Sequence, residues 1–420
     1  MTDYMKKLMS YCQSALKWCS FGILTGVVTG FVASVFAKLI LYVSDFRMEH
    51  PLIILLLPVA GLFIAFLYRL AGDSIAGGTD LVIKNIQNGD KMPVRLAPVI
   101  FIATVITHLF GGSVGREGAA LQLGSSMGSS LGRLLHFKDH DERRVIMCGM
   151  SGAFSALFGT PLAAMILPVE ISTVGNMYYS ALVPCALSSL FANHIARAMG
   201  LSSGVMNPDL HFDPDGPKNL ILIFLFAIIA ALVSALFSVS VSRAEKFAEG
   251  KIKNDYIRIF VLGLTVVGLT FLSGNQNYNG TGASIIVSAL DDNGAGLPWF
   301  AFLLKILFTA ITLAAGFKGG EIVPALFIGA TLGNAYSMLT GLNPGMCAAI
   351  GMGSMFCGIT NCPVAALLIS FELFGFSGVP YFMIAIPITY LFSGNYGVYK
   401  GQKIVYSKFH PEKIDENVHD

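Results

Sequence analysis

The sequence predicts an all-α, polytopic membrane protein built from two inverted repeats whose helices are interrupted. Three observations lead to this fold class. Apolar residues make up 54% of the 420 residues and charged residues only 12%, about half the charged share of an ordinary soluble protein. Several apolar stretches approach the ~20 residues that a transmembrane helix needs. Two glycine-rich segments also recur in the second half of the chain, each at nearly the same offset from its first copy.

Eight apolar stretches are candidate membrane helices. They cover residues 21–45, 51–71, 96–112, 178–193, 218–242, 257–273, 298–317 and 378–393. The first is too long for a signal peptide, and no small-residue cleavage site follows it. We expect a single membrane transport domain over residues 18–405, with repeats at about 18–200 and 215–395. We expect a cytoplasmic N-terminal segment at 1–17 and a cytoplasmic tail at 406–420.

The distribution of charge predicts the orientation. Basic residues cluster in five places: Lys6, Lys7 and Lys17; Lys84, Lys91 and Arg95; Arg133, Lys138, Arg143 and Arg144; Arg243, Lys246, Lys251, Lys253 and Arg258; and Lys400, Lys403, Lys408 and Lys413. The connections at 201–217 and 274–296 instead carry Asp209, Asp213, Asp215, Asp291 and Asp292. By the positive-inside rule both termini are cytoplasmic. We therefore expect a multi-pass protein of the plasma membrane and no nucleic-acid partner.

An internal repeat relates the two halves of the chain. GMSGAFSALFGTPLAAMILPVE at 149–170 aligns without a gap with GMGSMFCGITNCPVAALLISFE at 351–372. At nearly the same offset, Gly-Arg-Glu-Gly at 115–118 corresponds to Gly-Gly-Glu at 319–321. Two segments at one offset indicate duplication. The first long apolar stretch begins at a basic flank and its counterpart at an acidic one, which makes the repeats inverted, as in many secondary transporters.

The glycine-rich breaks predict an anion site. Non-helical backbone inside a bilayer must be buried in protein or line a cavity. A helix that begins within the membrane presents free N–H groups and a positive dipole end there. Two such helix starts, near 115–118 and 319–322, would bind an anion without a full positive charge, so that the ion can leave again.

Glu117 is the foremost candidate functional residue, because a carboxylate in a membrane segment is costly. When charged it could occupy the anion's place at the half-helix start, and protonation would release it. It would then be both gate and proton carrier. The alternative is a structural ion pair with Arg116. Glu321 is the corresponding second acid, either repulsive to an anion unless protonated or a neutral donor in a structural hydrogen bond.

Other polar residues in apolar segments are expected to be structural. Glu170 and Glu372, paired by the repeat, are expected to cap helices or bond between them. His108 is expected to pack at a helix end rather than to relay protons. The seven cysteines form no C-x-x-C pair, so we expect packing residues and neither metal nor cofactor.

These motifs resemble those of the CLC family of chloride channels and proton-coupled anion antiporters. GGSVGREGAALQLG at 111–124 resembles the family's G-[KR]-E-G-P segment, and GGEIVP at 319–324 resembles its G-x-F-x-P segment. AGGTDLVIKNIQNGDKMPVR at 76–95 falls where the family has G-S-G-I-P. The similarity spans about residues 20–405. It implies the CLC inverted repeat with re-entrant half-helices, and a homodimer with one pathway per subunit.

The resemblance also assigns candidate site residues. Thr79 takes the position of the family's anion-binding serine, and Tyr399 that of its tyrosine. The anion-binding backbone N–H groups correspond to Glu321 and Ile322, and the gating glutamate corresponds to Glu117. The flanking residues Gly115, Arg116 and Gly118 complete the candidate anion site.

The departures from the family pattern bear on the mechanism. The G-S-G-I-P segment has lost its proline, and Ala119 stands where proline follows G-R-E-G. The inner glutamate of the chloride antiporters corresponds to Ile171, so the usual inner proton route is missing. We also expect no cytoplasmic CBS domains, which are common in eukaryotic members.

The sequence is most similar to the fluoride-exporting bacterial branch. HLFGGSVGREG at 108–118, the acid of GGEIVP and YLFSG at 390–394 carry this similarity, although Val323 replaces that branch's threonine and Thr79 its usual Asn or Met. The expected function is halide transport across the bilayer, chloride or fluoride, coupled to protons, with fluoride favoured. The alternative is a passive voltage- or pH-gated chloride channel.

Two other classes fit the sequence less well. An intramembrane zinc protease would need H-E-x-x-H, which is missing. A serine protease would have only Ser113 and His108, with no orienting acid. A structural scaffold would leave Glu117 and the duplicated glycine breaks unexplained.

Overall fold

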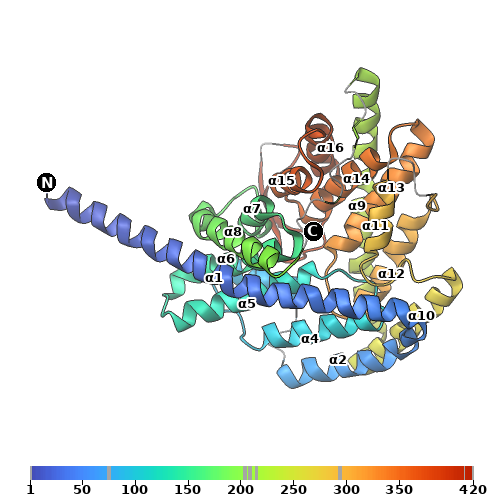
Figure 1. Ribbon diagram of the computed structural model, residues 1–420, viewed down its shortest axis with the longest axis horizontal. Coiled ribbons are helices and arrows are strands. Elements are labelled where there is room, and N and C mark those ends of the chain that lie inside the picture. The colour runs from blue at the N-terminus through green and yellow to red at the C-terminus, as the bar shows by residue number, and fades with distance from the viewer. Residues whose placement is uncertain are drawn as a thin grey trace.

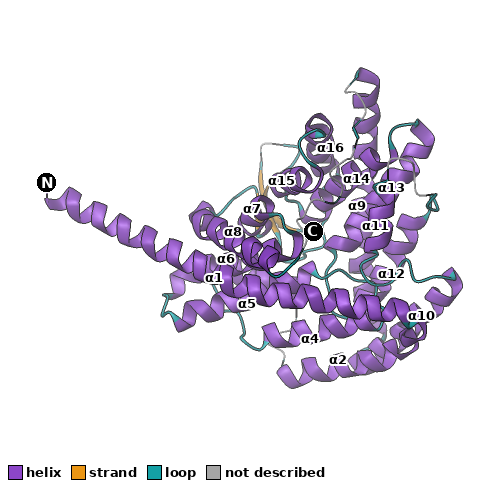
Figure 2. Ribbon diagram, viewed as in Figure 1, coloured by secondary structure: helices purple, strands orange, loops and turns teal. Residues whose placement is uncertain are grey.

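The computed structural model describes residues 2–72, 77–201, 206, 211–212, 216–291, 296–410 and 412–418. Asp209, Asp213, Asp215 and Asp292, which support the predicted orientation, lie outside these residues. Within the described part the chain is mostly helical, with sixteen α-helices (Figure 2). The predicted helical class is therefore confirmed.

The helices fall into two halves of eight, with 3-10 turns (η) between some of them. The first half contains α1 (Thr2–Glu49), η1 (Pro51–Leu56), α2 (Leu57–Ala71), α3 (Gly78–Asn88), α4 (Leu96–Leu109), α5 (Glu117–Leu134), η3 (Asp139–Asp141), α6 (Glu142–Phe158), α7 (Pro161–Ile171), η4 (Tyr179–Ala181) and α8 (Leu182–Ala198). The second contains α9 (Pro217–Lys251), α10 (Asp255–Ser273), α11 (Ala283–Ala289), α12 (Ala301–Ala315), α13 (Ile322–Thr340), α14 (Pro344–Thr360), α15 (Pro363–Phe374) and α16 (Val379–Phe392).

The two halves pack in the same order. α5 packs against α6 as α13 does against α14, and α1 packs against α4 and α8 as α9 does against α12 and α16. Glycines make the first of these crossings close. A β-carbon on Gly149 would overlap the carbonyl group of Gly124, and one on Gly351 would overlap that of Gly329. The repeated glycines thus place the backbones of each helix pair in direct contact.

The predicted membrane stretches are all largely helical, with revised limits. Five helices of the described part are long and apolar enough to cross a bilayer: residues 4–49, 51–71, 217–251, 255–273 and 322–340. The predicted stretch 96–112 ends earlier, at Leu109, because the chain turns at Gly111 with φ +86°. The stretch 298–317 begins only at Ala301. α13 was not predicted as a span, and it is mostly buried inside the protein.

Helix α1 includes residues 2–17 of the predicted N-terminal segment. Its 48 residues correspond to about 72 Å at 1.5 Å per residue, more than twice the ~30 Å of a bilayer core. In Figure 1 its N-terminal part projects from the rest of the molecule. Residues 2–17 therefore form a helical extension of the first membrane helix.

A small sheet was not predicted. β2 (Lys403–Tyr406) pairs in parallel with β1 (Thr173–Val174) and antiparallel with β3 (Lys413–Asn417). The predicted limit between domain and tail at residue 405 falls inside β2. The Gln402 amide nitrogen donates to the carbonyls of Ile171 and Thr360, both at 2.8 Å. The chain after α16 is therefore fastened to both halves.

Glu170 and Glu372 cap each other's repeat. The Glu170 carboxylate accepts from the backbone N–H groups of Val364 (3.1 Å) and Ala365 (2.9 Å) at the start of α15. The Glu372 carboxylate accepts from Leu162 (2.8 Å) and Ala163 (2.9 Å) at the start of α7. These pairs satisfy N–H groups that have no partner within their own helix. The predicted capping role is confirmed.

We expect Glu170→Gln to destabilise the protein by about 1–3 kcal/mol, because the amide would place a donor against one of the two N–H groups. Glu372→Gln should have a smaller effect, since Glu372 is partly exposed and Glu170 is buried. Thermal unfolding of the detergent-solubilised protein measures both. If both variants unfolded at the same temperature as the wild-type protein, the capping assignment would be contradicted.

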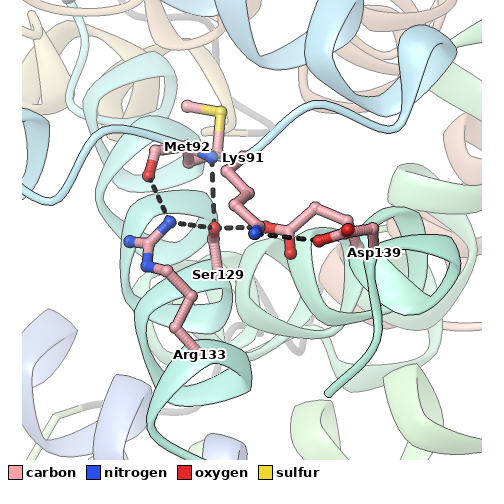
Figure 3. Close-up of polar contacts among 6 residues, drawn as sticks. Lys91, Met92, Ser129, Arg133 and Asp139 are labelled. Atoms are coloured by element: carbon pink, nitrogen blue, oxygen red, sulfur yellow. Dashed lines mark hydrogen bonds and ion pairs between the residues drawn. The ribbon is translucent and has the colours of Figure 1, made fainter. Parts of the chain in front are cut away.

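The connection from α3 to α4 is held by the end of α5 (Figure 3). The Arg133 guanidinium donates to the Met92 carbonyl at 3.0 Å, and the Met92 N–H donates to the Ser129 hydroxyl oxygen at 3.1 Å. Lys91 and Asp139 form an exposed ion pair at 2.8 Å, which lowers the pKa of Asp139. Such exposed pairs contribute little stability, so the buried bonds fix α3 relative to α5.

Candidate functional site

The two interrupted segments meet at a reciprocal backbone bridge. Gly115 donates its N–H to the Gly320 carbonyl at 2.6 Å, and Gly320 donates to the Gly115 carbonyl at 2.8 Å. α5 begins two residues after Gly115, and α13 two residues after Gly320. A β-carbon on Gly320 would overlap the backbone nitrogen of Gly118. The starts of the two half-helices are therefore joined by backbone that only glycine can form this closely.

The Glu117 carboxylate lies between these helix starts. Glu117 is 1% exposed. Its Oε2 accepts from the Arg116 N–H at 2.9 Å and from the Val323 N–H, in the first turn of α13, at 3.4 Å. The alternative ion pair is long, with 3.9 Å between Arg116 Nε and Glu117 Oε1. The carboxylate thus occupies the place where an anion was predicted, bonded to backbone from both halves.

Two cavities lie next to this bridge. The first, the Thr79 cavity, has a volume of about 280 Å³ and includes Thr79, Glu321 and Tyr399 in its lining. The second, the Glu117 cavity, has a volume of about 500 Å³ and includes Glu117 and Val323. They share no lining residue. Glu117 therefore lines only the second of these two cavities.

The Thr79 cavity contains polar atoms without protein partners. Among the described residues, the Tyr399 hydroxyl, Glu321 Oε2 and Gln122 Oε1 are buried and unbonded. The Gln122 amide nitrogen lies 3.4 Å from the Thr79 hydroxyl oxygen. Buried polar groups normally have hydrogen-bond partners, so these atoms indicate a place for a small polar ligand or an ion.

Tyr399 is held in the cavity wall by its neighbours. The Gly401 N–H donates to Asp80 Oδ1 at 3.0 Å, which ties this chain segment to α3. Lys400 forms an ion pair with Glu245 of α9 at 2.5 Å. Because α3 also carries Thr79, these contacts fix the two hydroxyl-bearing residues in one frame.

The remaining predicted residues lie around the bridge. Gly118 faces Thr79, since a β-carbon there would lie 3.2 Å from the Thr79 hydroxyl oxygen. Ile322 is buried at the first position of α13 and lines neither cavity. Arg116 lines the Glu117 cavity. Gln122 was missed, although an amide in an otherwise small and apolar helix segment after Glu117 was a usable signal.

His108 and five of the seven cysteines fit their predicted packing roles, whereas Cys12 is exposed and Cys19 is only partly buried. His108 is fully buried, with Nδ1 2.8 Å from the Thr104 carbonyl of its own helix. The seven cysteines are unpaired. Within the described ranges, no group of three or more His, Cys, Asp or Glu side chains is arranged to hold a metal ion.

Comparison with known proteins decides the family. The family model described as voltage gated chloride channel matches residues 60–394, most of the chain. The chain belongs to the CLC family. The resemblance predicted from the glycine-rich motifs is therefore confirmed, and the protein is an integral membrane transporter or channel rather than an enzyme.

Individual relatives agree with the assignment of this chain to the CLC family. It is 34% identical over 413 residues to a chloride/fluoride channel protein of Pseudomonas syringae pv. tomato, covering 95% of this chain and 89% of that one. It is 25% identical over 399 residues to an H(+)/Cl(-) exchange transporter ClcA of Vibrio vulnificus, covering 88% and 85%.

Solved structures share the fold. The crystal structure of a CLC-type fluoride/proton antiporter superposes with a TM-score of 0.88 at 31% identity, covering 93% of this chain and 98% of that one. A slow cyanobacterial Cl-/H+ antiporter superposes with a TM-score of 0.77 at 17% identity, over 90% and 94% of the two chains. The predicted CLC fold is thereby confirmed.

Proposed function

We propose that this protein exchanges a halide for protons, with fluoride favoured over chloride, and that Glu117 is its gate and proton carrier. One observation carries the proposal: the Glu117 carboxylate accepts hydrogen bonds from the backbone N–H groups of Arg116 and Val323, where the two half-helices meet. The same donors suit an incoming anion. The similarity to a fluoride/proton antiporter and to a chloride/fluoride channel protein supports the choice of ion.

The gating step follows from electrostatics. A charged Glu117 is attracted to the helix starts and closes the path between the two cavities. A protonated Glu117 loses most of that attraction, because the N–H groups and helix dipoles favour negative charge. A halide then competes for the vacated position. One side chain thereby alternates between anion mimic and proton carrier.

The Thr79 cavity is the proposed anion site. The hydroxyls of Thr79 and Tyr399 donate to the ion, together with the N–H group of Glu321, all from residues that line the cavity. The N–H group of Ile322, which lies next to Glu321 but does not line the cavity, is the remaining proposed donor. The free buried hydroxyl of Tyr399 supports this role. Neutral donors bind the ion without a fixed positive charge, which lets it leave again.

Glu321 is the proposed second acid on the proton route. Its Oε2 is buried without a protein partner, and its residue lines the Thr79 cavity. Ile171 stands where chloride antiporters have an inner glutamate, so another acid must receive the proton. A protonated Glu321 also avoids repelling the anion beside it.

We further propose that both termini are cytoplasmic in the plasma membrane, so that the Thr79 cavity opens inward. The transport domain covers residues 18–405 and assembles as a homodimer, with one pathway per subunit. The basic clusters near the N-terminus and around residue 250 support the orientation.

Efflux from proteoliposomes tests the proposal. Vesicles loaded with fluoride or with chloride are diluted into anion-free buffer, and external pH is recorded. Fluoride efflux that drives proton uptake against a gradient supports the fluoride/proton antiporter. Fast chloride efflux without coupled proton movement would favour the alternative, a passive channel gated by Glu117.

We expect Thr79→Ala to change anion selectivity more than stability, because only the hydroxyl at the cavity wall is lost. The ratio of fluoride to chloride flux should change by about an order of magnitude, the effect of roughly 1.4 kcal/mol. Parallel flux assays with fluoride, chloride and bromide measure this. An unchanged selectivity series would remove Thr79 from the site.

A further inference from the structure

A buried guanidinium in the wall of the Glu117 cavity forms no ion pair with any residue that the structure describes. Arg47, near the end of α1, is 5% exposed, and its Nε and Nη1 have no hydrogen-bond partner. Its third nitrogen contacts only the Met48 sulfur, at 3.9 Å. In the chain as described, no ion pair joins Arg47 to a carboxylate, although the exposed Asp45 lines the same cavity. An unpaired buried charge in a membrane protein is costly and marks a functional site.

A second buried basic side chain bonds to the loop that connects α10 to α11. Lys305 of α12 is fully buried, and its Nζ donates to the carbonyls of Tyr278 (3.1 Å) and Gly280 (2.8 Å). Arg47 lies against the same residue, because a β-carbon on Gly280 would be 2.9 Å from Arg47 Nη1. Two buried basic side chains therefore flank one short loop, and no described acid lies between them. A bound anion would offset the charge of Arg47.

The surrounding backbone is shaped to accept the Arg47 side chain. Gly111 and Gly280 have φ of +86° and +56°, which favours glycine over other residues. A β-carbon on Gly111 would lie 3.5 Å from Arg47 Cδ. The Gly280 N–H donates to the Gly112 carbonyl at 3.1 Å, so the loop is fixed to the segment that precedes Glu117.

We infer that the Glu117 cavity contains a second binding site for a small monovalent anion, at the Arg47 guanidinium. Its free Nε and Nη1 hydrogens donate to the ion. The site deepens the proposed function, on which it rests. It concentrates the transported halide on the Glu117 side of the barrier, ready to replace the carboxylate when Glu117 is protonated.

Bromide-soaked crystals of the wild-type protein test the site directly. We expect an anomalous peak beside Arg47, separate from any peak in the Thr79 cavity. Arg47→Met should abolish the first peak and leave the second. Arg47→Lys, which keeps the charge, should retain weaker density. The wild-type peak decides the question even if Arg47→Met does not fold.

Transport measurements provide a second readout. With the anion varied on the Glu117 side, Arg47→Met should raise its apparent KM about tenfold with little change in maximal flux. The matched control is Lys218→Met, which removes an exposed cation at the start of α9, the end of that helix away from the Thr79 cavity. The control should leave KM unchanged.

The outcomes separate this site from the proposed transport function. Bromide in the Thr79 cavity alone, with an unchanged KM in Arg47→Met, overturns the Arg47 site and leaves the antiporter standing. Bromide at Arg47 in a protein that moves no anion supports the site and overturns the transport function.

Discussion

Replacing Glu117 by Gln should abolish proton coupling while anion flux continues. The amide copies the shape of the protonated acid and cannot carry a proton or become negative. The neutral amide would no longer compete with a halide for the N–H groups of Arg116 and Val323. We expect the proton-to-anion flux ratio to fall to zero and the fluoride leak to become passive. Simultaneous recording of fluoride efflux and external pH in proteoliposomes measures the ratio.

Glu142→Gln is the matched control for this experiment. Glu142, the first residue of α6, is another buried carboxyl, and it accepts a hydrogen bond from the Ser129 hydroxyl of α5. It lines neither of the two cavities. Its replacement should leave the flux ratio unchanged. Uphill proton movement by Glu117→Gln would falsify the gate assignment, whatever the anion flux.

Adding a single methyl group at Gly351 should prevent stable folding. The β-carbon of Gly351→Ala would overlap the carbonyl group of Gly329, so α13 and α14 would have to separate along their whole contact. Overpacking of this kind costs about 1–3 kcal/mol or more, and here backbone rather than a movable side chain blocks the way. The yield of monodisperse protein and the thermal unfolding midpoint measure the loss.

Two further substitutions make the test specific. Gly149→Ala, the equivalent change between α6 and α5, should have a similar effect, because its β-carbon meets the Gly124 carbonyl in the same way. Gly268→Ala in α10 should be harmless or slightly stabilising, since nothing lies within 4 Å of its β-carbon position. Equal tolerance of all three changes would contradict the close helix contacts.

Local patterns were enough to predict the architecture. Glycine breaks, apolar stretches and the duplicated segments indicated two halves with interrupted helices, and the acids in those breaks indicated Glu117 and Glu321. The limits of the shorter helices were less accessible, because helices such as α4 and α12 have only 14 and 15 residues, fewer than a complete membrane span needs. The small sheet was missed because its strands are short, and its pairing joins residues far apart in sequence.

The candidate site was only partly visible in the sequence. Thr79 and Tyr399 were predicted as site residues only from the family resemblance, since no local pattern connects residues so far apart. Gln122 was overlooked because an amide carries no charge to attract attention. Arg47 was overlooked because a basic residue just after an apolar stretch is ordinarily a membrane flank. Lys305 was overlooked although a lysine inside the stretch 298–317 was a usable signal. Only their burial, and the lack of a partner for Arg47, distinguish them.

The bridge between Gly115 and Gly320 has a consequence for how such a protein can diversify. The join between the halves consists of main-chain atoms, which substitutions of neighbouring side chains do not remove. Residues beside it, such as Thr79 and Val323, can therefore change while the frame remains intact. Ion preference and structural integrity are then separate properties, and one scaffold can be adapted to different anions through a few exchanges around a constant centre.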